Sequence, residues 1–354
     1  DQQFDQSQLW ADQFQGWNDP NDIDNMNWDS YMQAIDPTKT NDPEYEFSEN
    51  NPYIQQEPSE NKNDDNVNYF EEGLRLMQSG NLNEAILAFE ACVKKEPERS
   101  EGWRYLGICH ADNENENGAI SAYLKCNQLD PYDLDALLQL GVSYTNEIDP
   151  FRALNYLKQW MGNHPDYSML ADEADLKQQE PKIKPGILGG WSGSKEEHKK
   201  VVALFNKALS VNPTDSELHS VLGVLYNITS EFDIAENHFK KAIQSSPKDP
   251  SLWNKLGATQ ANGGKCKDAI RAYSKALQLK PNYVRALSNL GISFANQDMH
   301  KEACQSYLAS LKLNSSADSV WDHLTMSLMH LNRGDLVELC KHKDVKYFRN
   351  HFDF

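Results

Sequence analysis

The chain has 354 residues and a formal net charge of −19, and its aromatic content of 10% is enough for a large folded core. Its acidity argues against binding to nucleic acid or to an anionic membrane surface, and no apolar run is long enough to span a bilayer. The six cysteines show no metal-ligand spacing. We therefore expect reduced structural thiols, no metal site and no cofactor.

The N-terminal part of the chain differs in composition from the rest. The first 66 residues hold sixteen carboxylates, two lysines and no arginine, and they are rich in Asn, Gln and Pro. Such a segment buries too little apolar surface to offset the entropy lost on ordering. We expect residues 1–65 to form a disordered acidic arm. Within it, Trp10 and Phe14 would share one face if the segment became helical.

After residue 66, small, aromatic and proline residues recur at fixed spacing. Gly107, Ala119, Tyr123 and Pro131 stand at offsets 0, 12, 16 and 24. Three further sets with the same offsets begin at Gly73, Gly223 and Gly257. This spacing is typical of the tetratricopeptide repeat, a unit of about 34 residues that forms two antiparallel helices.

Each residue type in this pattern has a physical role. The small residues let the first helix of a unit (helix A) pack closely on the second (helix B), and the aromatic residue fills the space between them. The proline ends helix B, because it lacks an N–H and clashes with the preceding turn. One hairpin cannot bury its apolar face alone, so neighbouring units must stack. We expect an all-α superhelix of about seven repeats.

The pattern divides the repeat region into four parts. Residues 66–165 carry repeats one to three, and residues 214–316 carry repeats five to seven. Between them, residues 166–213 hold a broken fourth repeat, which we expect to act as a hinge whose helix B begins near Lys195. Residues 317–354 are predicted to form helices that cap the stack.

Helix A of each repeat should line the concave face of the superhelix. Position 13 of the repeat is Asn in three repeats (Asn146, Asn262 and Asn296), and further amides and cations stand at other groove positions. Asn is also an ordinary surface residue in this Asn-rich chain, but its recurrence at one position favours a binding role. An amide both donates to and accepts from a peptide backbone, and Lys or Arg suits a carboxylate. The pattern indicates a groove for an extended peptide with a free C-terminus.

Three strings within these helices closely resemble the peroxin-5 family. They are Val142-Ser-Tyr-Thr-Asn-Glu147, Trp253-Asn-Lys-Leu-Gly-Ala-Thr-Gln-Ala-Asn262 and Tyr283-Val-Arg-Ala-Leu-Ser-Asn-Leu-Gly-Ile-Ser-Phe-Ala-Asn296. Members of that family are soluble receptors for the C-terminal Ser-Lys-Leu type peroxisomal targeting signal. The resemblance covers residues from about 66 to the C-terminus.

The resemblance implies a role for each groove residue. Asn146, Asn254, Asn262, Asn289 and Asn296 would hold the backbone of the signal. Arg285 and Lys255 would lie near its terminal carboxylate, and Glu147 could face its basic middle residue. Val142, Thr145 and Ala258 would shape the pocket for the last side chain, and Asn227 matches a further family position.

The resemblance also implies partners and a location. Trp10 and Phe14 match the Trp-x-x-x-Phe/Tyr motif with which the family docks on peroxin-14-like and peroxin-13-like membrane partners. The chain would be a cytoplasmic receptor that cycles to the peroxisomal membrane, and not an enzyme. Three other functions remain open: a co-chaperone that clamps an acidic tail, an enzyme with a repeat arm, and a scaffold of a larger complex.

Overall fold

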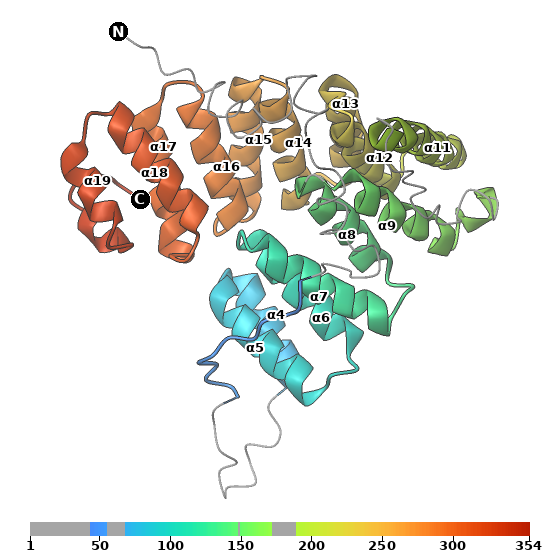
Figure 1. Ribbon diagram of the computed structural model, residues 1–354, viewed down its shortest axis with the longest axis horizontal. Helices are drawn as coiled ribbons and strands as arrows, with labels where there is room; N and C mark the ends of the chain where they lie inside the picture. The colour runs from blue at the N-terminus through green and yellow to red at the C-terminus, as the bar shows by residue number, and fades with distance from the viewer. Residues whose placement is uncertain (1–42, 55–67, 148, 172–188) are drawn as a thin grey trace, which may run out of the picture. The chain divides into compact units, whose positions relative to one another are not determined.

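The computed structural model describes residues 43–54, 68–147, 149–171 and 189–354, with side chains after the last gap described from residue 195 onward. Trp10 and Phe14 lie outside the described residues. The regular secondary structure of the described residues is entirely helical, as predicted (Figure 1). No described helix combines the length and the apolar character that a membrane span requires.

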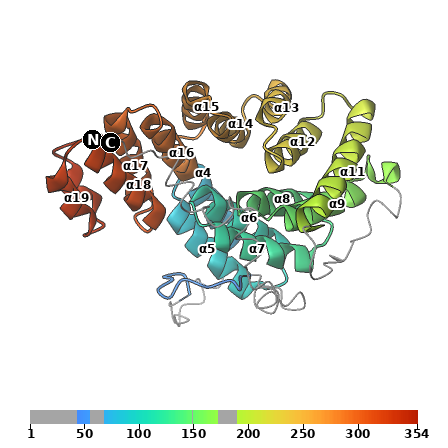
Figure 2. The same cartoon turned by 45° about the horizontal axis from the view of Figure 1, so that its top comes forward.

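The α-helices follow one another as antiparallel pairs along most of the chain (Figures 1 and 2). They are α4 (Tyr69–Ser79), α5 (Leu82–Lys95), α6 (Ser100–Asp112), α7 (Glu116–Leu129), α8 (Leu134–Asn146), α9 (Pro150–Asn163), α11 (Gly189–Val211), α12 (Ser216–Ile228), α13 (Phe232–Ser245), α14 (Pro250–Asn262), α15 (Cys266–Leu279), α16 (Val284–Ala295), α17 (His300–Leu313), α18 (Asp318–His330) and α19 (Gly334–Cys340). Two short 3₁₀ helices, η2 (Ser168–Leu170) and η3 (Val345–Phe348), complete the set in the described residues.

The small residue in helix A faces the aromatic residue in helix B within each regular repeat. A Cβ placed on Gly107 of α6 would lie 2.5 Å from Cε1 of Tyr123 on α7, which is closer than van der Waals contact allows. Gly257 and Tyr273 repeat this arrangement in α14 and α15, at 2.6 Å. The aromatic rings are fully buried there. Glycine at this position therefore sets how closely the two helices of a unit approach each other.

The fourth unit departs from the expected hinge at both of its ends. Helix α11 begins at Gly189, earlier than the expected Lys195, because the Gly-Gly pair starts the helix instead of interrupting the chain. At the other end, Tyr167 is 2% exposed and donates a hydrogen bond of 2.5 Å to Asp215 Oδ2, at the start of α12. The start of the expected hinge is therefore packed into the core, and residues 172–188 lie outside the described residues.

Residues 43–54 form an ordered strap on the first repeat, so the expectation of disorder through residue 65 is wrong for this part. Glu90 of α5 is 1% exposed, and its carboxylate accepts hydrogen bonds from Tyr45 Oη, Ser48 N and Oγ, and Asn51 Nδ2, each at 3.0 Å. The Tyr45 ring also packs edge-on against Trp103. These polar and aromatic contacts compensate for the low apolar content that suggested disorder.

The C-terminal helices extend the repeat pattern. Trp103 and Trp253 each donate from Nε1 to the carbonyl of the proline that ends the preceding repeat, at 3.2 and 3.0 Å. Trp321 of α18 makes the same bond to Ser315 O, at 2.9 Å, although repeat seven lacks the proline. Helix α18 thus takes the place of another helix A. Phe348 and Phe352 are buried in the cluster that covers it.

Repeat seven lies against repeats one and two, which are far from it in the sequence. Asn83 Nδ2 donates to Leu313 O at 2.8 Å, and Asn314 Nδ2 donates to Asn113 O at 2.7 Å. Helix α16 contacts α6, and in Figure 1 the lower end of α16 approaches the α6–α7 hairpin. This return brings residues of repeats two and seven to one pocket.

Candidate functional site

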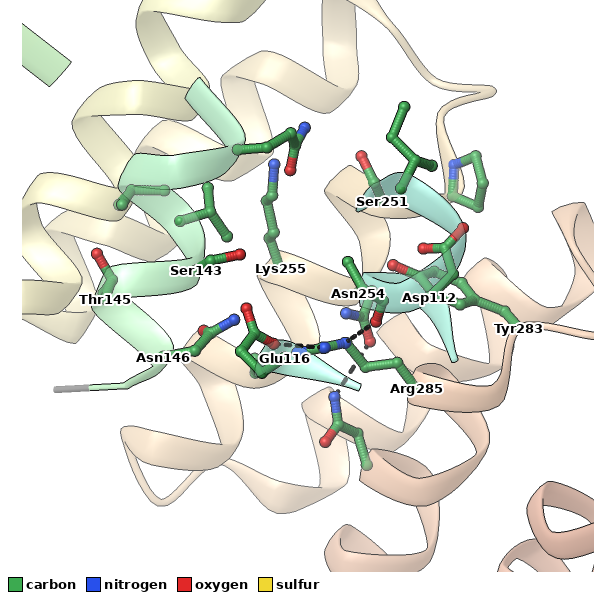
Figure 3. A pocket seen from close by; sticks show the side chains of 18 of the residues that line it. Asp112, Glu116, Ser143, Thr145, Asn146, Ser251, Asn254, Lys255, Tyr283 and Arg285 are labelled. Carbon is green, nitrogen blue, oxygen red and sulfur yellow. Dashed lines mark hydrogen bonds and ion pairs between the residues drawn. The ribbon is translucent and has the colours of Figure 1, made fainter. Parts of the chain in front are cut away.

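A pocket of about 450 Å³ lies among the A helices of repeats two, three, five, six and seven. Helices α6, α8, α12, α14 and α16 contribute most of its lining residues. On each helix the lining positions, single or in adjacent pairs, recur every three or four residues, so they share one face. Figure 3 shows the polar side chains converging on this space from α8, α14 and α16.

Most of the predicted groove residues line this pocket. The structure brings together Val142, Thr145, Asn146, Asn227, Asn254, Lys255, Ala258, Asn262, Arg285 and Asn289. Glu147 and Asn296 are not among the lining residues: each is exposed at the C-terminal cap of its helix, α8 or α16. Their predicted contacts with a ligand stay predictions.

The amide side chains differ in how far the protein already satisfies them. Asn254 is 6% exposed, and its Oδ1 accepts a hydrogen bond from Asn289 Nδ2 at 3.3 Å. Asn227 Nδ2 donates to Thr259 Oγ1 at 3.0 Å, which leaves the buried Asn227 Oδ1 without a partner among the described residues. Asn146 and Asn262 are exposed at the ends of their helices. Amide donors and acceptors that lack a partner within the protein can form hydrogen bonds with the N–H and C=O groups of a bound chain.

Arg285, which the sequence placed near a ligand carboxylate, is engaged within the protein. Its Nη2 donates to Glu116 Oε2 and its Nε to Ala111 O, both at 2.6 Å. The side chains are 18% and 14% exposed for Arg285 and Glu116. Burial opposes the charged guanidinium, but the carboxylates of Glu116 and Glu114 outweigh it and raise the pKa of Arg285. Its charge is therefore compensated by an internal carboxylate.

Lys255 contrasts with the other two cations that line the pocket. Lys280 forms an ion pair with Asp112, and Arg285 forms one with Glu116. The Lys255 ammonium has no hydrogen bond or ion pair with any of the described residues, and burial lowers its pKa against the opposing effect of the Asp249 and Asp112 carboxylates. A partly buried cation without a directly paired carboxylate is available to an anionic group.

Several lining residues were missed in the sequence. Asp112 occupies position 13 of repeat two, and Gln139 occupies position 6 of repeat three, so the repeat register could have identified both. Glu116 begins helix B and Tyr283 precedes helix A, so neither stands at a groove position. Only the return of repeat seven onto repeat two brings these two residues to the pocket.

The fold and the pocket define a tetratricopeptide-repeat domain with a cavity lined by amide, charged and aliphatic side chains. Family profiles described as "Tetratricopeptide repeat" and "TPR repeat" match residues 70–133 and 261–298. Together with the helical pairs, these matches confirm the repeat fold.

Similarity to curated proteins indicates a particular group within the tetratricopeptide-repeat proteins. The chain is 42% identical over 213 residues to "Peroxisome biogenesis protein 5" of Arabidopsis thaliana, which covers 60% of this chain and 25% of the relative. It is 35% identical over 201 residues to the "Peroxisomal targeting signal receptor" of Yarrowia lipolytica, covering 55% of this chain and 30% of the relative. It is also 36% identical over 175 residues to the mouse "PEX5-related protein", and this match covers 48% of this chain and 30% of the relative.

These relatives confirm the resemblance to the peroxin-5 family that the groove strings indicated. The match spans about a quarter to a third of the length of these relatives.

Proposed function

We propose that this chain acts as an import receptor for matrix proteins of peroxisomes or of a specialised peroxisome such as a glycosome. It would bind their C-terminal Ser-Lys-Leu type signal in the pocket, in the cytoplasm, and carry them to the organelle membrane. The names of the relatives support a receptor role. The observation that carries the proposal is the combination, in one pocket, of a row of amides with a Lys255 ammonium that makes no ion pair with a described residue.

The chemistry of the pocket suits a short extended C-terminus. Lys255 would bind the terminal carboxylate, since it is the lining cation that makes no ion pair with a described residue. The amides of Asn146, Asn227 and Asn262 would pair with main-chain groups of the ligand. Val142 and Ala258 present aliphatic surface to the last side chain. A side chain of Leu size gains roughly 1.5–3 kcal/mol from full burial.

A co-chaperone that clamps an acidic tail is the main alternative. Such a tail brings several carboxylates, which would require several available cations. In this pocket Asp112 and Glu116 compensate Lys280 and Arg285. The charge distribution therefore favours a ligand with one terminal carboxylate.

Peptide binding with a free or blocked C-terminus tests the proposal. A fluorescent peptide ending in Ser-Lys-Leu-COOH should bind with a micromolar or lower Kd, which corresponds to about −8 kcal/mol or better. The amidated peptide should bind much more weakly, because it lacks the anion for Lys255. Anisotropy titrations that give equal affinities for both peptides would refute the carboxylate site. A multiply acidic peptide that binds more tightly than either would support the co-chaperone alternative.

Amide replacement tests the role of the asparagines. Asn262→Ala should weaken peptide binding by roughly 1–3 kcal/mol, because a polar group of the peptide would lose its partner. The thermal midpoint should stay unchanged, since Asn262 is exposed and outside the core. Asn117→Ala, on the exposed face of α7, is the matched control and should bind like the wild type. Calorimetry showing equal affinity for both variants would remove Asn262 from the site.

We infer that Trp10 and Phe14 dock the receptor on a peroxin-14-like partner, and on a peroxin-13-like partner in the same complex. Two aromatic side chains on one helical face can anchor such an interface. Replacing both by Ala should abolish capture by the N-terminal domain of the peroxin-14-like protein and leave signal-peptide binding intact. Wild-type capture in a pull-down of the double variant would exclude this pair as the anchor.

A further inference from the structure

Two ion pairs in the pocket join distant parts of the chain. Glu116 and Arg285 are separated by 169 residues in the sequence, and Asp112 and Lys280 by 168. Both carboxylates come from the α6–α7 hairpin of repeat two, and both cations come from the start of repeat seven or the turn before it. In Figure 3 Glu116 and Arg285 lie in the middle of the pocket, between Asn146 and Asn254. The Glu116 carboxylate is therefore a fixed negative charge inside the proposed binding site.

A chain of hydrogen bonds fixes the start of α7, where Glu116 lies. It is the first residue of α7, and the preceding Asn115 caps that helix by accepting from Gly118 N at 3.0 Å. Asn115 Nδ2 also lies 3.1 Å from His110 Nδ1, and His110 Nε2 lies 2.7 Å from Tyr45 Oη of the strap. Because the amide N–H of Asn115 donates to His110 Nδ1, the imidazole proton stays on Nε2 and donates to Tyr45. Tyr45 in turn donates to Glu90.

One oxygen of Glu116 has no partner. Oε2 accepts from Arg285, while Oε1 is buried and makes no hydrogen bond to a described residue. The Glu116 side chain that carries this unpaired oxygen lines the pocket in which the ligand's C-terminus would lie. A second carboxylate brought to Arg285 would meet the negative charge of Glu116 at short range. In a partly buried site such repulsion is screened much less than in water.

We propose that Glu116 is an internal counter-carboxylate that determines the strength and the specificity of anion capture in this pocket. It occupies Arg285, leaves Lys255 as the cation that receives the ligand's carboxylate, and limits the pocket to one such group. The role rests on the proposed function, since it concerns how the same pocket binds a C-terminus. Glu116 thereby lowers the affinity for the anionic end and favours release of the bound chain.

Charge removal at Glu116 tests this role. Glu116→Gln keeps the size of the side chain and frees the positive charge of Arg285. It should tighten binding of Ser-Lys-Leu-COOH by about tenfold, as expected when a repulsive charge is removed at short range. Binding of the amidated peptide should change less than twofold. The matched control is Glu101→Gln, which removes the same charge from an exposed site on α6 and should leave both affinities unchanged.

A double variant ties the effect to Arg285. Glu116→Gln combined with Arg285→Gln removes both charges, so the acid affinity should return to within about twofold of the wild type. An unchanged or weaker acid affinity in the single variant would overturn the proposal and leave the receptor function standing. The proposal is also overturned if the double variant keeps the full tenfold gain in affinity for the Ser-Lys-Leu-COOH peptide. A wild-type protein that binds the acid and the amide equally would overturn both the proposal and the receptor function.

Discussion

Repeat six and the fourth unit both bury aromatic rings, but they do so by different means. In repeat six, Gly257 on α14 faces Tyr273 on α15, and the contact follows from two positions of the repeat pattern. At the fourth unit, Phe205 of α11 packs against Trp160 of α9 in repeat three, with ring centroids 5.6 Å apart, and Tyr167 stacks on His164 at 4.4 Å. A regular repeat thus obtains its core from spacing within the unit. The broken unit keeps the aromatic position at Phe205, but the rings that pack there come from the preceding repeat and from the segment that follows it.

The largest expected loss of stability concerns the aromatic cluster between α9 and the α11 helix of the fourth unit. Trp160 is 1% exposed and lies among residues of α9, α11 and the Tyr167 segment. Trp160→Ala should therefore cost about 3–5 kcal/mol of unfolding free energy, because it leaves a large cavity. Denaturant unfolding would measure this cost. A loss below about 1 kcal/mol would mean that the fourth unit does not share the core of its neighbours.

The corresponding substitution in repeat six adds volume instead of removing it. Gly257→Ala should destabilise the protein by about 1–3 kcal/mol, since the new methyl group would lie 2.6 Å from the Tyr273 ring. Gly334→Ala is the control, because a Cβ there meets no atom within 4 Å. Thermal unfolding should shift for the first variant and not for the second. Equal midpoints would show that the glycine does not limit the approach of the two helices.

The polar contact of Tyr167 should contribute less than the aromatic packing around it. Tyr167→Phe keeps the ring and removes the hydrogen bond to Asp215, so we expect a loss of about 1.5–3 kcal/mol, the range for bonds to charged groups. Tyr132→Phe, at a site that is 73% exposed, is the matched control. The difference in unfolding free energy between the two variants isolates this bond. A smaller loss would indicate that stacking alone holds the segment before residue 172.

The smallest expected loss of stability concerns Glu236, whose carboxylate joins repeats five and six, and this loss depends on pH. Burial would raise the pKa of Glu236, but hydrogen bonds from Lys240, Lys265 and Gln260 outweigh it and lower this pKa from 4.5 to about 2. The folded state therefore gains stability from the ionised carboxylate above pH 4.5, and the gain is lost as the pH falls toward 2. Glu236→Gln should cost roughly 1 kcal/mol at neutral pH, since both lysines are partly exposed.

Stability curves of Glu236→Gln and the wild type should converge between pH 4.5 and 2. A constant difference across that range would mean that packing, and not charge, accounts for the effect. Glu338→Gln, which removes a carboxylate from the exposed pair with Lys341, should change stability very little at any pH and serves as the control.

The sequence by itself determined the repeat units and the groove positions. The helix pairs and the glycine–aromatic contacts depend on residues within one unit, and Val142, Asn254 and Ala258 each take an inward position that the register of their own repeat sets. Such contacts are local, so periodic spacing is sufficient to predict them. The same spacing also identified the amides and Lys255 as pocket residues.

Only the tertiary structure decided the contacts between distant segments. The pairing of Arg285 with Glu116, the strap on Glu90 and the hydrogen bond of Tyr167 to Asp215 join residues that no repeat spacing relates. The strap and Tyr167 belong to segments outside the regular repeats. The Arg285–Glu116 pair depends on how neighbouring units accumulate rotation along the stack, which is a property of many packed interfaces together. For this reason the sequence could identify Lys255 and Arg285 as groove cations, but not that an internal carboxylate already pairs with Arg285.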